Sequence, residues 1–174
     1  MYNRGRDESL VPPRACRCVV SGRPSVVDRV FPPQMNDYRG SKWVVVAMAL
    51  YAVLLTVRSL IHMFASDGGA HSIATIDISV EGGDHLVALF AQWGALQLLL
   101  AGIVWAVVLR LRVMVPFMAL VLFLEPVLRA AMGALKPVET VGTAPGAALN
   151  NVVLIPLAVL LVLSITTIRP RPTT

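Results

Sequence analysis

The chain has 174 residues, of which 56% are hydrophobic and 14% are charged. Soluble globular domains carry about 25% charged residues, so this composition excludes an ordinary soluble domain. The net charge of +5 does not indicate a nucleic-acid partner, because most Lys and Arg lie in the N-terminal segment or beside hydrophobic blocks. That distribution is typical of membrane orientation and not of a basic face on a folded domain.

The N-terminal segment, residues 1–41, is rich in Arg, Pro, Gly and Ser and has no hydrophobic periodicity. Such a composition cannot bury enough apolar surface to fold, so we predict a disordered, basic, cytoplasmic tail. An alternative is that translation begins at Met35 and that the preceding residues are not made. Cys16 and Cys18 lack the second cysteine pair of a zinc site, and we interpret them as incidental thiols.

Residues 42–168 contain hydrophobic blocks of about twenty residues, the length that crosses a bilayer core of about 30 Å as an α-helix. These blocks predict four transmembrane helices, at about 43–65, 86–109, 113–132 and 150–168. The fold class that follows is an all-α, polytopic, four-helix bundle. Residues 169–174 are expected to form a short cytoplasmic tail.

The orientation follows from where the charges lie between the spans. Arg110 and Arg112 form a short basic turn between the second and third spans, whereas the segment 66–85 contains acidic residues and no Lys or Arg. Positive residues concentrate on the cytoplasmic side of membrane proteins. We therefore expect both termini in the cytoplasm and the protein in a bacterial plasma membrane.

The third span carries Glu125, Pro126 and Arg129 inside a hydrophobic stretch. A charge at membrane depth costs roughly 2.5–3.5 kcal/mol, so we expect these charges to have partners or a function. When depth is counted at about 1.5 Å per residue from the outer boundary, the polar residues of different spans fall in the outer half of the bilayer. This predicted polar layer contains Arg58, His62, Gln92, Glu125 and Arg129.

Three interpretations of the polar layer stay open, one of which is a proton path through Glu125 and His62. In the first, Arg58 pairs with Glu125 and Gln92 bonds one of them, so that a buried network fixes how the helices pack. In the second, the same residues line a cavity open to the outside. Since two arginines face one glutamate, the positive surplus favours an anionic lipid headgroup, a quinone or another amphiphile.

The second span carries a stripe of small residues that lie roughly on one helical face. Small residues allow a neighbouring transmembrane helix to approach closely, so we predict a helix-packing face here. The stripe consists of Ala91, Ala95, Gly102 and Ala106.

The histidines His62, His71 and His85 are weak candidates for a metal site. Imidazole and nearby carboxylates suit zinc, copper or iron, but the spacing matches no ligand motif that we can name. The sequence also contains no Gly-rich phosphate loop, no G-x-S-x-G and no H-E-x-x-H. We therefore predict no metal, no cofactor and no catalytic set, and we allow for a bound lipid.

Two stretches, ALFAQWGALQLLLAGIVWAV in the second span and LEPVLRAAMG in the third, carry a resemblance to a known group. Together with the acidic loop after the first span, they resemble the small four-helix bacterial membrane proteins of the DoxX-like families and related domains of unknown function. The resemblance covers about residues 42–168. It implies an uncharacterised or helper subunit, since some members of these families are similar to accessory subunits of membrane oxidoreductases.

The leading functional hypothesis is a non-catalytic accessory or structural subunit, with other integral membrane subunits and membrane lipids as partners. The alternative is a protein that binds a lipid or a quinone-like amphiphile at the polar layer. A third hypothesis is a metal or redox accessory that uses the histidines of the outer loop.

Overall fold

The computed structural model describes residues 36–168, so the predictions for residues 1–35 and 169–174 lie outside it. The described chain is helical: α2 (Lys42–Phe64), α3 (Gly83–Leu109), the 3₁₀ turn η2 (Arg112–Met114), α4 (Val115–Leu135) and α5 (Pro145–Thr166). Four of its helices are long and apolar enough to cross a membrane. The predicted all-α architecture with four candidate spans is confirmed.

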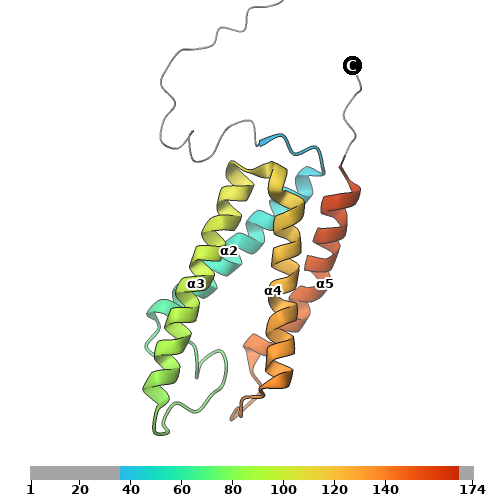
Figure 1. The fold of residues 1–174 in the computed structure, drawn as a ribbon. Coiled ribbons are helices and arrows are strands. Elements are labelled where there is room, and N and C mark those ends of the chain that lie inside the picture. The colour runs from blue at the N-terminus through green and yellow to red at the C-terminus, as the bar shows by residue number, and fades with distance from the viewer. Residues whose placement is uncertain (1–35, 169–174) are drawn as a thin grey trace, which may run out of the picture.

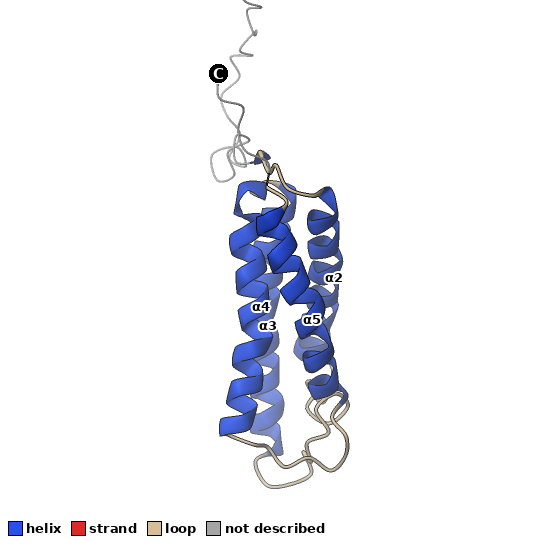
Figure 2. Cartoon of the chain, turned by 90° about the vertical axis from the view of Figure 1, so that its right-hand side faces the viewer, coloured by secondary structure: helices blue, strands red, loops and turns tan. Residues whose placement is uncertain are grey.

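The helices run antiparallel in chain order and form an elongated bundle (Figures 1 and 2). Both ends of the described chain lie at one end of the bundle, together with the turn between α3 and α4 (Figure 1). We call this the terminus end, and the opposite end, which carries the 65–82 and 136–144 loops, the loop end. Helix α2 packs chiefly on α3, and α4 chiefly on α5. Helices α3 and α4 diverge toward the loop end (Figure 1).

Helix boundaries follow local chemistry. The Ser41 hydroxyl accepts a hydrogen bond of 3.3 Å from the Trp43 amide and so caps the start of α2. Helix α5 starts at Pro145, earlier than the predicted residue 150. Proline suits a first helical turn because the amide that it lacks would have no partner there. Helix α4 continues past Pro126 to Leu135, beyond the predicted end at 132.

The buried core is apolar and lies along the centre of the bundle. Most other large hydrophobic side chains are exposed on the outer surface, as lipid-facing residues are in membrane proteins. The most deeply buried hydrophobic side chains of the core include Met48, Ala52, Leu55, Ala101, Val104, Val115, Met118, Ala119 and Leu122.

The last residues of the predicted N-terminal tail pack against the end of α5. The Ser41 amide donates to the Thr167 hydroxyl at 2.9 Å, and the Tyr38 hydroxyl donates to the Ser164 carbonyl at 3.2 Å. Burial against this helix raises the pKa of Tyr38. Residues 36–41 thus belong to the folded part of the chain.

The two loops at the loop end are joined by hydrogen bonds. The Val141 amide donates to the Thr75 carbonyl at 2.9 Å, and the Gly146 amide donates to the Ile73 carbonyl at 3.2 Å. The Thr75 hydroxyl donates to the Gly142 carbonyl at 3.1 Å. These bonds connect the α2–α3 hairpin to the α4–α5 hairpin at the end where no helix-to-helix turn joins them.

The small-residue stripe on α3 does not face α2. Ala95 and Gly102 are exposed, and no atom lies within 4 Å of the position that a Gly102 Cβ would take. The close approach of α2 and α3 occurs at Gly94, where a Cβ would lie 2.7 Å from the His62 Cβ. Ala95 and Gly102 of the stripe thus lie on the outer face of α3, and the prediction that the stripe packs against a neighbouring helix stays a prediction.

Candidate functional site

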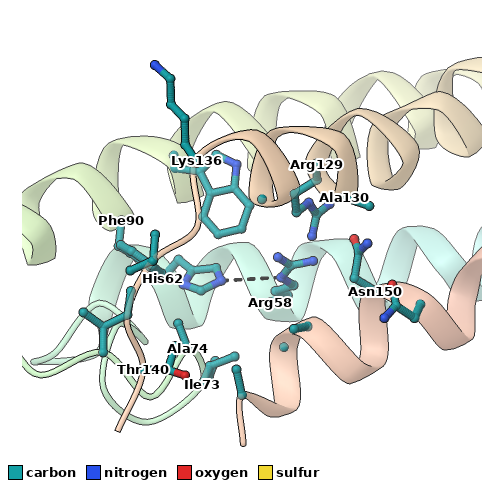
Figure 3. A pocket seen from close by; sticks show the side chains of 18 residues that line it. Arg58, His62, Ile73, Ala74, Phe90, Arg129, Ala130, Lys136, Thr140 and Asn150 are labelled. Atoms are coloured by element: carbon teal, nitrogen blue, oxygen red, sulfur yellow. Dashed lines mark hydrogen bonds between the residues drawn. The ribbon is translucent and has the colours of Figure 1, made fainter. Parts of the chain in front are cut away.

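A cavity of about 470 Å³ lies at the loop end of the bundle and is lined by all four helices and both loops (Figure 3). We call it the loop-end cavity. Its polar and aromatic wall comes from the helices and consists of Arg58, His62, Phe90, Trp93, Arg129, Asn150 and Asn151. Ile73, Ala74 and Ile76 of one loop and Val138 and Thr140 of the other also line it. The loop-to-loop hydrogen bonds therefore hold part of its wall.

His62 is only 1% exposed and orients Arg58. Its Nδ1 lies 2.7 Å from the Gly68 carbonyl oxygen. A carbonyl only accepts, so Nδ1 carries the proton and Nε2 is left as an acceptor. The Arg58 Nε donates to that Nε2 at 3.4 Å. The neutral imidazole thus commits the Nε of Arg58 and leaves its two terminal nitrogens for other partners.

Trp93 brings the two arginines of the polar layer together. The guanidinium carbon of Arg58 lies 4.9 Å from the centre of the Trp93 ring, and that of Arg129 lies 5.3 Å from it. Both distances are typical of cation–π contacts. Trp93 is not among the residues predicted for the polar layer. Its spacing from Phe90 and Gln97, three and four residues along α3, was a usable signal because such residues share a helical face.

Glu125 is paired with Arg129 on its own helix and accepts a hydrogen bond of 3.1 Å from the Gln97 Nε2. The predicted direct pair between Arg58 and Glu125 is therefore corrected: Arg58 bonds His62 instead. Residues four apart on a helix are neighbours before any tertiary packing occurs, which gives Arg129 the advantage over an arginine on another helix.

Gln92 does not join the polar layer, because its side chain is exposed. Gln97, which is 4% exposed, takes the predicted role. The two positions are about 140° apart around a helix that turns about 100° per residue. Gln97 lies on the same helical face as Trp93, four residues away, and this spacing distinguishes it from Gln92.

Several buried polar atoms have no hydrogen-bond partner within residues 36–168: Gln97 Oε1, Glu125 Oε2, Arg129 Nε and Asn150 Oδ1. Asn150 is 7% exposed, and its Nδ2 donates to the Pro126 carbonyl at 3.2 Å. Asn150 also lines the loop-end cavity, and its Oδ1 is the atom without a partner in the described chain. Buried polar atoms are usually bonded, so Arg129 Nε and Asn150 Oδ1, whose residues line the cavity, keep one donor and one acceptor for a polar ligand.

The three histidines do not form a joint site. His62 is committed to Gly68 and Arg58, and the Nδ1 of His71 lies 3.3 Å from the Ile76 carbonyl oxygen. Within the described part of the chain, no three His, Cys, Asp or Glu side chains come together as metal ligands. The loop histidines therefore offer no metal centre among residues 36–168.

The chain matches no protein-family model, no curated protein and no solved structure. The resemblance to the DoxX-like families therefore stays a prediction.

Proposed function

We propose that this chain is a multi-pass membrane protein that binds an amphiphile with an anionic head in the loop-end cavity. The observation that carries this proposal is the position of Arg58. Its side chain lines the cavity, is half-buried, and has no carboxylate within ion-pairing distance among residues 36–168. Glu125, the carboxylate of the polar layer, is paired with Arg129.

Two guanidinium groups beside one indole repel each other, and both are partly removed from water. A charge in such surroundings is costly unless an opposite charge compensates it. An anion in the loop-end cavity supplies that charge, and the aromatic and aliphatic parts of the wall suit an apolar tail. The positive surplus and the mixed wall together favour an amphiphile over a purely polar or purely apolar ligand.

The charges at the two ends of the bundle support an orientation with the loop end outside. The terminus end carries Arg39, Lys42, Arg110 and Arg112 with Asp37, whereas the loop end carries Asp67, Asp77, Glu81, Asp84 and Glu139 with Lys136. By the positive-inside rule, the terminus end faces the cytoplasm of a bacterial plasma membrane. The ligand then comes from the outer leaflet.

The test is to purify the protein in a mild detergent and to identify bound lipids by native mass spectrometry. The protein with Arg58→Gln should retain less anionic amphiphile than the wild type, whereas Arg58→Lys should retain an intermediate amount. The matched control is Arg39→Gln, which removes an arginine that pairs with Asp37 at the terminus end. Equal retention in the wild type and in Arg58→Gln contradicts the proposal.

A second candidate function is an accessory subunit that packs against a larger membrane complex. The outward face of α3 favours it, because Ala95, Gly102 and Ala106 line a shallow groove together with Leu99 and Ile103. Small residues at such a face let a transmembrane helix of a partner subunit approach closely. Gly102→Leu should then release a stoichiometric partner in native purification, while leaving lipid retention unchanged. A wild-type protein that purifies as a monomer without a partner contradicts this second function.

A further inference from the structure

The donors of the two cavity arginines are only partly used. Arg58 commits its Nε to His62, and Arg129 commits one terminal nitrogen to Glu125. The two terminal nitrogens of Arg58, and the Nε and second terminal nitrogen of Arg129, have no hydrogen bond within residues 36–168. Figure 3 shows the two guanidinium groups pointing toward each other from α2 and α4, with Asn150 beside them.

This arrangement suits a tetrahedral anion better than a planar one. A carboxylate holds its two oxygens in one plane and faces a single guanidinium as a fork. A phosphate group directs its oxygens to different sides and can therefore accept from two guanidinium groups that approach from different helices. Glu125 offsets one charge of the pair, so the two arginines together keep a net positive charge for an anionic phosphate ester.

The wall between α3 and α4 offers a path for an acyl chain. Phe90 and Trp93 line the cavity from α3, and Ala130 and Gly133 line it from α4. Ala130 and Gly133 are exposed, and nothing lies within 4 Å of the position that a Gly133 Cβ would take. These two helices diverge toward the loop end (Figure 1). Aromatic rings from α3 and small, exposed residues from α4 therefore line the cavity on the side where these two helices diverge.

We propose that the loop-end cavity binds a phospholipid, with its phosphate between Arg58 and Arg129 and its acyl chain passing between α3 and α4 beside Gly133. This inference rests on the proposed function and names its ligand class and its path. It requires both ends of the ligand: a phosphate head for the arginines and an apolar chain for the path between α3 and α4.

The requirement for both a phosphate head and an apolar chain is tested with three ligands: one has both parts, one has only the chain with a carboxylate head, and one has only the phosphate head. The delipidated wild-type protein is titrated in detergent with oleoyl lysophosphatidic acid, with oleate, and with glycerol phosphate, and adducts are measured by native mass spectrometry. Lysophosphatidic acid should bind at least roughly tenfold more tightly than either of the other two. Equal binding of oleate overturns the phosphate head, and equal binding of glycerol phosphate overturns the lipid source.

The path of the acyl chain between α3 and α4 is tested by substituting two glycines that both have open space at the Cβ position. Gly133→Trp should weaken binding of lysophosphatidic acid by roughly tenfold or more, whereas Gly102→Trp should leave it unchanged. Both glycines are exposed with open space at Cβ, but Gly102 lies on the outer face of α3. Ala130→Trp obstructs the same path about one helical turn from Gly133 and should also weaken binding of lysophosphatidic acid. Equal binding by the wild type and both blocked variants overturns the path between α3 and α4.

The outcomes separate this inference from the proposed function. If the wild type binds none of the three ligands and Arg58→Gln changes no retained lipid, the proposed function fails and the phospholipid inference fails with it. If oleate binds as tightly as lysophosphatidic acid and both depend on Arg58, the amphiphile site stands and the choice of a phosphate head is wrong.

Discussion

Glu125 is paired with Arg129 four residues further along α4, and the same Oε1 accepts from Gln97 on α3. Arg58 is oriented by a different set of contacts, with His62 and the Trp93 ring. The polar layer therefore consists of two local units that meet at Trp93. Their charged residues and His62 could be predicted from the sequence as a set at similar depth. Gln97, Trp93 and the pairing could not, because hydropathy does not show which side chains of neighbouring helices meet.

The pairing predicts a specific pattern in double-mutant cycles. Glu125→Ala and Arg129→Ala should each destabilise the protein more than the double variant does, because each single change leaves a partly buried charge without its partner. We expect a coupling free energy of about 1–3 kcal/mol, measured by unfolding in increasing SDS mole fraction. The cycle of Glu125 with Arg58 should give a smaller coupling. An equal or larger coupling to Arg58 contradicts the observed ion pair.

Asp67 holds the turn that follows α2. Its carboxylate accepts from the Gly69 amide at 2.9 Å and from the Ser72 amide at 2.7 Å. These backbone donors lower the pKa of Asp67 from 3.8 to about 2. The turn also presents the Gly68 carbonyl to His62, so it indirectly supports the orientation of Arg58.

This pKa shift predicts how the turn responds to acid. Because the pKa is lower in the folded protein than its ordinary value, the ionised carboxylate stabilises the fold. That contribution is complete above about pH 4 and is lost as the pH falls through about 2. Hydrogen exchange of the Gly69 and Ser72 amides should accelerate beyond its intrinsic pH dependence in this window. In Asp67→Ala the amides should be unprotected at every pH, and a retained acid step in that variant contradicts the assignment.

At the level of the helices, the sequence could predict where each span lies but not which side it turns inward. In a soluble helix, the polar face marks the surface; here α3 is apolar on the side that meets α2 and on the side that faces outward. The small-residue stripe and Gly94 were therefore indistinguishable as packing positions. Gly94 packs against Ser59, His62 and Met63 of α2.

Alanine substitutions distinguish the two positions. Gly94→Ala should destabilise the bundle by about 1–3 kcal/mol, because its Cβ would lie 2.7 Å from the His62 Cβ and 3.0 Å from the Ser59 carbonyl oxygen. Gly102→Ala should be neutral or slightly stabilising, since alanine is the better helix former and the space at Cβ is open. Both changes in the free energy of unfolding are to be measured by SDS unfolding in the same detergent. Equal destabilisation by the two changes contradicts the observed packing.

Across the whole molecule, two helical hairpins are connected at both ends. The turn through η2 joins α3 to α4 at the terminus end. At the other end the loops are joined by hydrogen bonds from the Val141 amide to the Thr75 carbonyl and from the Thr75 hydroxyl to the Gly142 carbonyl. The loop connection could not be predicted, because backbone hydrogen bonds between irregular segments leave no residue pattern. The hydrophobic blocks, by contrast, predicted the candidate spans directly, since span length is fixed by bilayer thickness.

The charge difference between the two ends predicts the topology, which cysteine labelling can measure. The starting protein is a variant with Cys16→Ser and Cys18→Ser, into which Glu81→Cys or Ile168→Cys is introduced. Glu81 lies in the 65–82 loop and Ile168 follows α5 at the terminus end, and both side chains are exposed. A membrane-impermeant thiol reagent should label Glu81→Cys in intact cells and Ile168→Cys only after the cells are opened, because the orientation that we propose from the basic residues has the terminus end in the cytoplasm. The opposite pattern would place the loop-end cavity on the cytoplasmic side, and the proposed phospholipid would then have to come from the inner leaflet.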